Sequence, residues 1–285
     1  MTCTSCLSHT KNTEPQAFEI ADFWEEAENI RTFVFRGTLN SEPGQFCMLW
    51  VPGCDEKPFS IARDYDGEIW LTICRVGPAT EKLFTLKKGD RVGLRGAFGH
   101  GFSVPTKIPP SPFEKGGEKK QVVLVGGGYG TAPLHFTGRA HQLAGSDVTM
   151  IIGARHKDLL IWDQKSAESG FRTLLATNDG SAGEKGFTTH ILEKLLSEEK
   201  IDLVQTCGPE KMMKAIAEMC LEKNVACEVS IERYMKCGFG VCGQCVTETG
   251  EKMCQIGPCV TAEKAMGFSD FGNYHRGPEG QKIAW

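Results

Sequence analysis

Val123 to Leu134 carries the sequence VLVGGGYGTAPL, in which a short apolar run enters a cluster of glycines and then a segment suited to a helix. The apolar run belongs to QVVLV, and four comparable runs follow it: DVTMIIG, FRTLLAT, DLVQTCG and ACEVSI, with helical stretches between them. This alternation predicts an α/β domain with a parallel sheet over residues 121–230.

The glycine cluster is a candidate nucleotide-binding loop, because glycines let backbone amides approach a pyrophosphate at a helix N-terminus. Thr131 stands where G-x-G-x-x-G has its last glycine, so a tight turn without a ligand is the alternative. The segment TCGPEKMM, which begins at Thr206, favours nucleotide binding because it ends another predicted strand at the same sheet edge. The candidate residues are Gly126, Gly127, Gly128, Gly130 and Thr131 from the first loop, with Cys207, Gly208 and Pro209 from the second.

The chain before this domain has a different pattern. Short runs rich in β-branched and aromatic residues, such as IRTFVFRG and EIWLTICRV, are separated by Gly, Pro and Asp turns. They predict a small antiparallel β-barrel over residues 15–104. Residues 105–120 include the sequence PTKIPPSPFEKGGEKK, whose proline, lysine and glycine content indicates an exposed linker or insertion.

The chain after residue 230 is dominated by cysteines. Cys237, Cys242, Cys245 and Cys254 have the spacing C-x4-C-x2-C-x8-C, which is typical of a plant-type 2Fe-2S site. The alternative is a structural zinc site, which usually pairs C-x2-C units across a longer spacer and fits the x4 gap poorly. We therefore expect residues 231–285 to form a 2Fe-2S module and tail.

A nicotinamide domain and a 2Fe-2S cluster require a third group between them. Nicotinamide gives up two electrons together as a hydride and the cluster accepts one, and a flavin handles both. In the predicted barrel, KPFSIAR and LTICRVGPAT offer an apolar face, hydroxyl groups, cations and a Gly-Pro turn that could hold a flavin and its pyrophosphate. Taken alone, these segments are an ordinary strand and loop.

Composition limits the other classes of function. The 285 residues are 40% apolar and 24% charged with a net charge of -4, so general attraction to nucleic acid or acidic lipid is not expected. No segment has the length of a membrane span, and the N-terminus lacks a signal-peptide core, which predicts a cytoplasmic protein. The roles of Cys3, Cys6 and Cys259 are not determined by the sequence.

The motifs GGGxGxAPL and CGPxxM follow the predicted barrel along the chain. With this order of parts, the chain resembles the ferredoxin-NADP reductase superfamily over most of its length. The resemblance implies FAD in the barrel and NAD or NADP on the α/β domain, with Ser60 near the flavin and Cys207 near the nicotinamide. Lys57 stands where the family usually has arginine, which keeps the charge and loses the bidentate fork. The implied FAD-binding residues are Lys57, Pro58, Phe59, Ser60, Ile73, Cys74, Arg75, Ala79 and Thr80.

ERYMKCGFGVCGQC and CQIGP most closely resemble the electron-transfer subunit of dihydroorotate dehydrogenase. The resemblance implies a partner catalytic subunit with FMN, a hetero-oligomer, and electrons passing through the 2Fe-2S cluster and FAD to NAD as dihydroorotate becomes orotate. The same modules occur in sulfhydrogenase gamma subunits, sulfur reductases and NADH-dependent ferredoxin:NADP oxidoreductases, where electrons leave NAD(P)H. A zinc-bound module without enzymatic activity is the remote alternative. Arg155 and His156, at the end of a predicted strand, leave NAD against NADP open.

Overall fold

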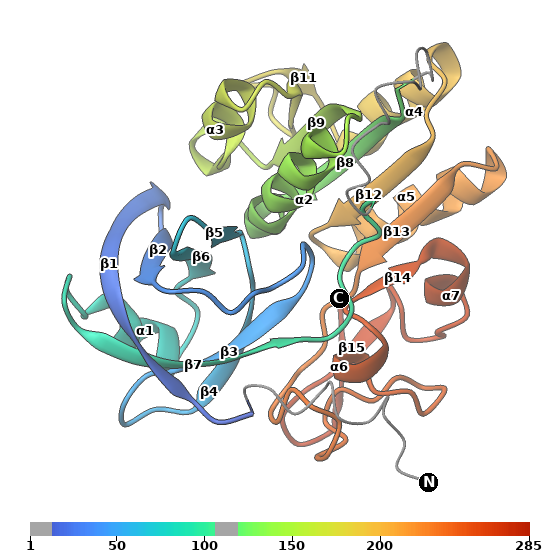
Figure 1. The fold of residues 1–285 in the computed structure, drawn as a ribbon. Coiled ribbons are helices and arrows are strands. Elements are labelled where there is room, and N and C mark those ends of the chain that lie inside the picture. Colours follow the sequence, from blue (N-terminus) through green and yellow to red (C-terminus); the bar gives the residue numbers. More distant parts are fainter. Residues whose placement is uncertain (1–12, 106–118) are drawn as a thin grey trace, which may run out of the picture.

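The computed structural model describes residues 13–105 and 119–285. Figure 1 shows two large sheets, the first in blue to teal and the second in green to orange, with the C-terminal segment in red beside the second sheet. The predicted barrel and α/β fold with a small C-terminal module is confirmed. Most of the predicted linker at 105–120 lies outside the described residues.

The first sheet is antiparallel and its strands follow the order β4-β3-β7-β1-β2-β6-β5. Phe33, Phe35, Leu71 and Ile73 pack inside it and are fully buried, because alternate residues of neighbouring strands face the same side. The strands are β1 Gln16–Ala27, β2 Ile30–Arg36, β3 Phe46–Trp50, β4 Glu56–Ser60, β5 Arg63–Tyr65, β6 Glu68–Cys74 and β7 Arg91–Phe98. Helix α1, Pro78–Phe84, adds the buried Leu83 to this core.

The second sheet has the order β11-β10-β9-β8-β12-β13-β14, and every pairing except the last is parallel. The chain builds outward from β8 in one direction and then returns to build from β12 in the other. Ligands of open α/β sheets bind at the carboxyl ends of strands where the order reverses in this way. The strands are β8 Gln121–Gly127, β9 Asp147–Ala154, β10 Arg172–Thr177, β11 Glu184–Lys185, β12 Leu203–Cys207, β13 Ala226–Ser230 and β14 Cys259–Thr261.

Helices cover both faces of this sheet, which explains why β8 is apolar at nearly every position. Val123 and Val125 pack with residues of α4 and α5, whereas Val122 and Leu124 pack toward α2. The helices are α2 Thr131–Leu143, α3 Asp163–Glu168, α4 Thr188–Glu198 and α5 Glu210–Glu222, and short 3-10 turns occupy η2 Gly128–Gly130 and η3 Lys157–Leu159. Within the described residues, no helix is long and apolar enough to cross a membrane.

The C-terminal segment packs directly on the second sheet. Its strand β14 pairs antiparallel with β13, and Met235, Cys254 and Phe271 share one buried core with the sheet. The other elements are α6 Met253–Ile256, α7 Ala262–Met266, β15 Tyr274–Arg276 and β16 Lys282–Ala284, the last two forming a hairpin. The division of the chain at residue 230 stays a prediction, and the structure adds that the last segment supplies an edge strand to the sheet before it.

Candidate functional site

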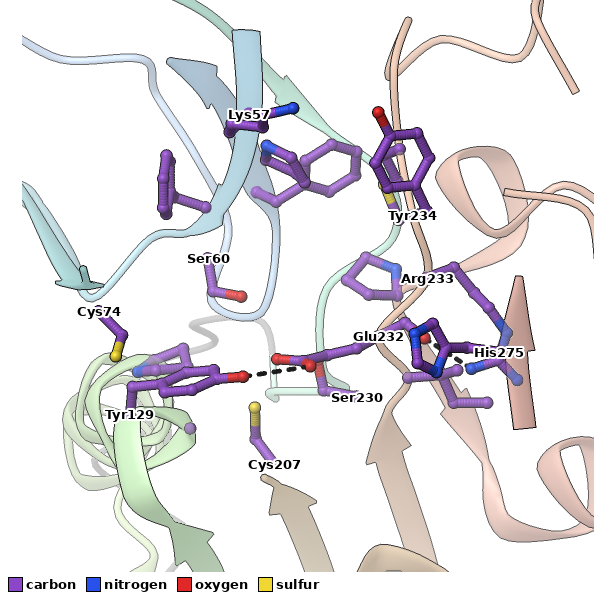
Figure 2. Close-up of a pocket in the computed structure, with 18 of the residues that line it drawn as sticks. Lys57, Ser60, Cys74, Tyr129, Cys207, Ser230, Glu232, Arg233, Tyr234 and His275 are labelled. Carbon is purple, nitrogen blue, oxygen red and sulfur yellow. Dashed lines mark hydrogen bonds between the residues drawn. The ribbon is translucent and has the colours of Figure 1, made fainter. Parts of the chain in front are cut away.

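A cavity of about 510 Å³ lies where the barrel, the second sheet and the C-terminal segment meet. Its volume is in the range usual for small-molecule sites. Figure 2 shows side chains entering it from all three parts: Ser60 from the barrel, Cys207 from the second sheet and His275 from the C-terminal hairpin. The cavity therefore adjoins the carboxyl ends of β8 and β12, where the strand order reverses.

The barrel wall contains most of the predicted flavin-binding strand. Lys57, Pro58, Phe59 and Ser60 all line the cavity from β4, and Cys74 joins them from the end of β6. The structure thus brings together a cation, a hydroxyl and an apolar surface on one wall.

The other predicted flavin residues do not line the cavity. Ile73 is fully buried in the barrel core, and Arg75 hydrogen-bonds through Nε to Asn29 Oδ1 at 3.0 Å on the barrel surface. Ala79 is buried in α1. The Thr80 hydroxyl accepts hydrogen bonds from the amides of Val76 and Gly77, at 2.9 and 3.1 Å. Thr80 therefore shapes the turn at the start of α1, beside the cavity-lining Val76.

The glycine loop and the TCGP loop interlock behind the cavity. An added Cβ at Gly130 would lie 2.5 Å from the Cys207 carbonyl oxygen, and one at Gly127 would lie 2.8 Å from Cδ of Pro209. Only a residue without a side chain permits these approaches. Gly130 and Cys207 line the cavity, whereas Gly126, Gly127, Gly128, Thr131, Gly208 and Pro209 form the framework around them and do not line it.

Cys207 ends β12 with its thiol directed into the cavity (Figure 2). Burial raises the pKa of this thiol to about 12, partly countered by a hydrogen bond with Ser230. The thiol is therefore neutral at ordinary pH, and it presents a compact polarizable surface rather than a nucleophile.

The predicted cluster cysteines lie in a loop with little regular structure, the cysteine loop from Cys237 to Cys254, in which the Cys237 side chain interacts with that of Cys242 and the Cys245 side chain with that of Cys254. The Cys242 amide approaches Cys237 Sγ at 3.5 Å, and the Cys254 amide approaches Cys245 Sγ at 3.4 Å. No group of three or more His, Cys, Asp or Glu side chains in the described parts of the chain is placed to hold a single ion. Two pairs of thiols suit two irons, each of which takes two thiolates.

The surroundings of two of these thiols, Cys237 and Cys245, favour the ionised form that binds iron, whereas the neighbouring Cys245 raises the pKa of Cys254. Burial would raise the pKa of Cys237, but backbone amides of Cys242 and Phe239 outweigh it and the pKa is lowered to about 7. A hydrogen bond from the Cys254 thiol is the main reason that the pKa of Cys245 is lowered, against burial, to about 6. The donor set therefore fits a 2Fe-2S cluster.

Comparisons with known proteins agree with this geometry. Residues 232–265 match the family described as the iron-sulfur cluster binding domain of dihydroorotate dehydrogenase B. A Methanocaldococcus jannaschii protein named as a probable dihydroorotate dehydrogenase B (NAD(+)) electron transfer subunit is 40% identical over 271 residues, covering 95% of this chain and 98% of that protein. A Thermococcus kodakarensis protein of the same name is 42% identical over 251 residues, covering 87% and 97%.

This chain belongs to the family of dihydroorotate dehydrogenase B electron transfer subunits. Among solved structures, an NADH-dependent reduced ferredoxin-NADP oxidoreductase, described in connection with flavin-based electron bifurcation, has a TM-score of 0.75 and 29% identity. The match covers 86% of this chain and 88% of that one. The family and the fold support FAD, 2Fe-2S and NAD as cofactors of this electron transfer subunit, which is an oxidoreductase component.

The electron transfer subunit has further cavity residues that the sequence analysis missed. The Tyr129 hydroxyl donates to Glu232 Oε2 at 3.4 Å, so a residue of the glycine turn meets one of the segment after β13 (Figure 2). The Glu232 carboxylate and burial raise the pKa of Tyr129, and desolvation by the cavity walls raises the pKa of Glu232. In the sequence, the only sign that Glu232 belongs to a site is its position just after the predicted strand ACEVSI.

The C-terminal hairpin is the second feature that was missed. His275 and Trp285 line the cavity with their ring centroids 4.2 Å apart. Both carry a buried nitrogen, Nδ1 and Nε1 respectively, without a hydrogen-bond partner among the described residues. The polar composition of this tail contained no indication of a place in a cavity.

Cys259 does not share its hydrogen bond or its buried core cluster with the four cysteines of the cysteine loop. It is buried on β14, and its thiol donates toward the Gly44 carbonyl oxygen of the barrel at 3.5 Å. The same thiol lies close enough to Cys207 and Ser230 to interact with both. Cys259 therefore belongs to the contact between the barrel and the second sheet. Cys3 and Cys6 lie outside the described residues.

Proposed function

We propose that this subunit carries electrons from dihydroorotate, oxidised to orotate on an FMN-containing catalytic partner, through its 2Fe-2S cluster and FAD to NAD. The observation that carries the proposal is a shared wall. The segment from Glu232 to Met235 lines the cavity and continues directly to Cys237, the first cysteine of the cysteine loop. The candidate two-electron and one-electron sites are therefore joined by one short piece of chain.

In this proposal the barrel wall holds FAD. Lys57 and Ser60 line this wall, where Lys57 would supply a positive charge and the Ser60 hydroxyl a hydrogen bond to the flavin. The flavin, when bound, supplies exchange between hydride and single-electron chemistry. The neutral Cys207 and Gly130 leave room for a flat nicotinamide ring on the opposite wall, because neither projects a large side chain.

We also propose that the catalytic partner docks on the cysteine loop, giving a hetero-oligomer. Phe239 and Val241 are 41% and 74% exposed there, although large apolar side chains are usually buried. Cys242 between Val241 and Gly243 is exposed as well. A partner that covers these residues would bring its own redox group close to the proposed cluster.

The proposed nicotinamide cofactor is NAD, in keeping with the names of the relatives. Arg155 and His156 follow β9 with partly or fully exposed side chains. A cytoplasmic location stays a prediction from the sequence.

The test is the visible spectrum of the chain purified anaerobically with the dihydroorotate dehydrogenase catalytic subunit of its host. We expect dihydroorotate to bleach the flavin and cluster bands and NAD to restore them. In Cys245→Ser, the cluster bands should disappear while bound FAD remains. Cys54→Ser, which changes a partly exposed cysteine outside the loop, should keep both. Bands that dihydroorotate leaves oxidised would overturn the pyrimidine role.

A second candidate is electron transfer from NADH or NADPH to a ferredoxin-linked partner. It is favoured by the likeness in fold to the NADH-dependent reduced ferredoxin-NADP oxidoreductase. In that case NADH or NADPH should bleach the bands and dihydroorotate should not.

A further inference from the structure

Arg95 connects the barrel to the cysteine loop. It lies on β7 with its side chain 6% exposed. Its Nη1 donates to the carbonyl oxygen of Cys237 at 2.6 Å, and its Nε donates to both carboxylate oxygens of Glu56, at 2.8 and 2.9 Å. One guanidinium thus holds the first predicted cluster ligand and a carboxylate of β4.

Aromatic rings enclose this guanidinium. The Arg95 Cζ lies 5.5 Å from the ring centroid of Phe98 on the barrel and 5.4 Å from that of Phe239 in the cysteine loop. The two rings are themselves 6.4 Å apart. This packing keeps water from the cation, so its charge acts at close range with less screening than a surface charge would have.

Strand β4 makes this connection relevant to the flavin site. Glu56, the partner of Arg95, is followed directly by Lys57, which lines the cavity and lies over the Tyr234 ring at 5.7 Å. Two consecutive residues of β4 are therefore connected to the chain around the start of the cysteine loop. Glu56 is connected to Cys237 through Arg95, and Lys57 contacts Tyr234 directly.

We propose that Arg95 is a positioning residue that fixes Cys237 against the flavin strand, and that the Arg95–Glu56 pair sets the reduction potential of the cluster. The inference rests on the proposed cluster ligands. A cation beside a cluster favours the reduced form, which carries one more negative charge, and a nearby carboxylate opposes this effect. Glu56 compensates most of the Arg95 charge as long as the pair is intact.

The decisive experiment is a redox titration of the holoprotein, followed by the electron paramagnetic resonance signal of the reduced cluster. Glu56→Gln keeps a hydrogen-bond acceptor for Arg95 and removes the compensating charge. We expect the midpoint potential to rise by about 59 mV, which corresponds to a tenfold change in a one-electron equilibrium. The matched control is Glu199→Gln, which alters the exposed ion pair between Glu199, at the end of α4, and Arg172. This variant should leave the midpoint potential unchanged.

An unchanged potential in Glu56→Gln, with wild-type FAD and iron content, would overturn the electrostatic role. Absence of the cluster signal from the wild-type protein would instead overturn the proposed ligand set, and this inference with it, so the two failures are distinguishable.

The positioning role has its own measurement. Arg95→Lys keeps the charge and loses the fork that reaches Glu56 and Cys237 together. We expect the cluster of Arg95→Lys to be removed by an iron chelator about tenfold faster than that of the wild type, with FAD content unchanged. Equal rates of cluster loss would show that Arg95 does not position Cys237.

Discussion

The cavity and the cysteine loop lie side by side and are stabilised in different ways. The cavity walls are strand ends and turns of two seven-stranded sheets, with Ser60 on β4 and Cys207 on β12. Between Lys236 and Lys252 the loop has no strand or helix, and one isolated bridge joins Val246 to Lys252. Contacts with other parts of the chain hold the loop, among them the bond from Arg95 to Cys237, and the ion pairs of Arg233 hold the segment that leads into it.

This difference shows how one chain supports two kinds of redox site. A site for flat, two-electron cofactors requires two walls at a set separation, and packed sheets provide them because their backbone is fully hydrogen-bonded. A cluster site requires thiolates on a chain that can wrap around a compact inorganic core, and glycine-rich backbone provides that at the expense of its own stability.

The largest effect is expected from Arg233→Met, which tests whether a buried charged anchor holds the segment that leads into the loop. Arg233 is 2% exposed, pairs with Glu210 of α5, and donates from Nη2 to Asp270 at 2.9 Å. Its removal leaves two buried carboxylates without their cation, so we expect the free energy of unfolding to fall by about 3–5 kcal/mol. Urea unfolding of the holoprotein measures this.

Arg172→Met is the matched control, because the Arg172–Glu199 pair is exposed. It should change the free energy of unfolding by less than about 1 kcal/mol. Equal losses in the two variants would contradict the view that the segment leading to the loop depends on a buried anchor.

A smaller effect is expected in the cavity wall from Gly130→Ala. The new methyl group would meet the backbone of Cys207 and Gly208, which cannot move without shifting β12. We expect a loss of about 1–3 kcal/mol in stability and slower reduction of the flavin by NADH, measured by thermal unfolding and stopped-flow absorbance.

The control for the cavity wall is Gly128→Asn. Gly128 has a φ of 55° and open space around its missing Cβ, and asparagine tolerates this conformation. If Gly128→Asn slowed flavin reduction as much as Gly130→Ala, crowding between the two loops would not explain the effect.

The smallest effect concerns Glu232, which stands between the two regions. Its pKa is raised above the ordinary 4.5, chiefly by desolvation, so the native state holds the proton more tightly than the unfolded chain does. Stability from this group is present below pH 4.5 and lost as the pH rises through the native pKa.

Glu232→Gln should therefore match the wild type near pH 4 and exceed it at pH 8. The gain should stay below about 1 kcal/mol, because the side chain is open to the cavity and water screens its charge. The measurement is the unfolding temperature of both proteins across this pH range. If Glu232→Gln were less stable than the wild type at pH 8, the pKa of Glu232 would be lowered rather than raised.

Much of the fold could be predicted from the sequence because its elements have local patterns. Short runs of β-branched and aromatic residues such as IRTFVFR indicated an antiparallel sheet, and apolar runs such as QVVLV separated by helical stretches indicated a parallel one; both sheets are present. At the site, Ser60 and Cys207, which belong to two of the predicted motifs, line the cavity. Ile73, Ala79 and Thr80, taken from the same family resemblance, do not line it, because strand alternation and helix packing turn their side chains away.

The sequence by itself determined the spacing of the four predicted cluster cysteines and the strand, turn and helix character of the nucleotide loops, because both depend on residues a few positions apart. Only the tertiary structure decided that Tyr129 meets Glu232, that Trp285 reaches the cavity, and that Arg95 holds Cys237. These partners are far apart along the chain, and their contact depends on which strands are neighbours in each sheet and on how the two sheets pack. Local sequence patterns do not specify such long-range pairings, because they follow from burying the apolar faces of the whole chain together.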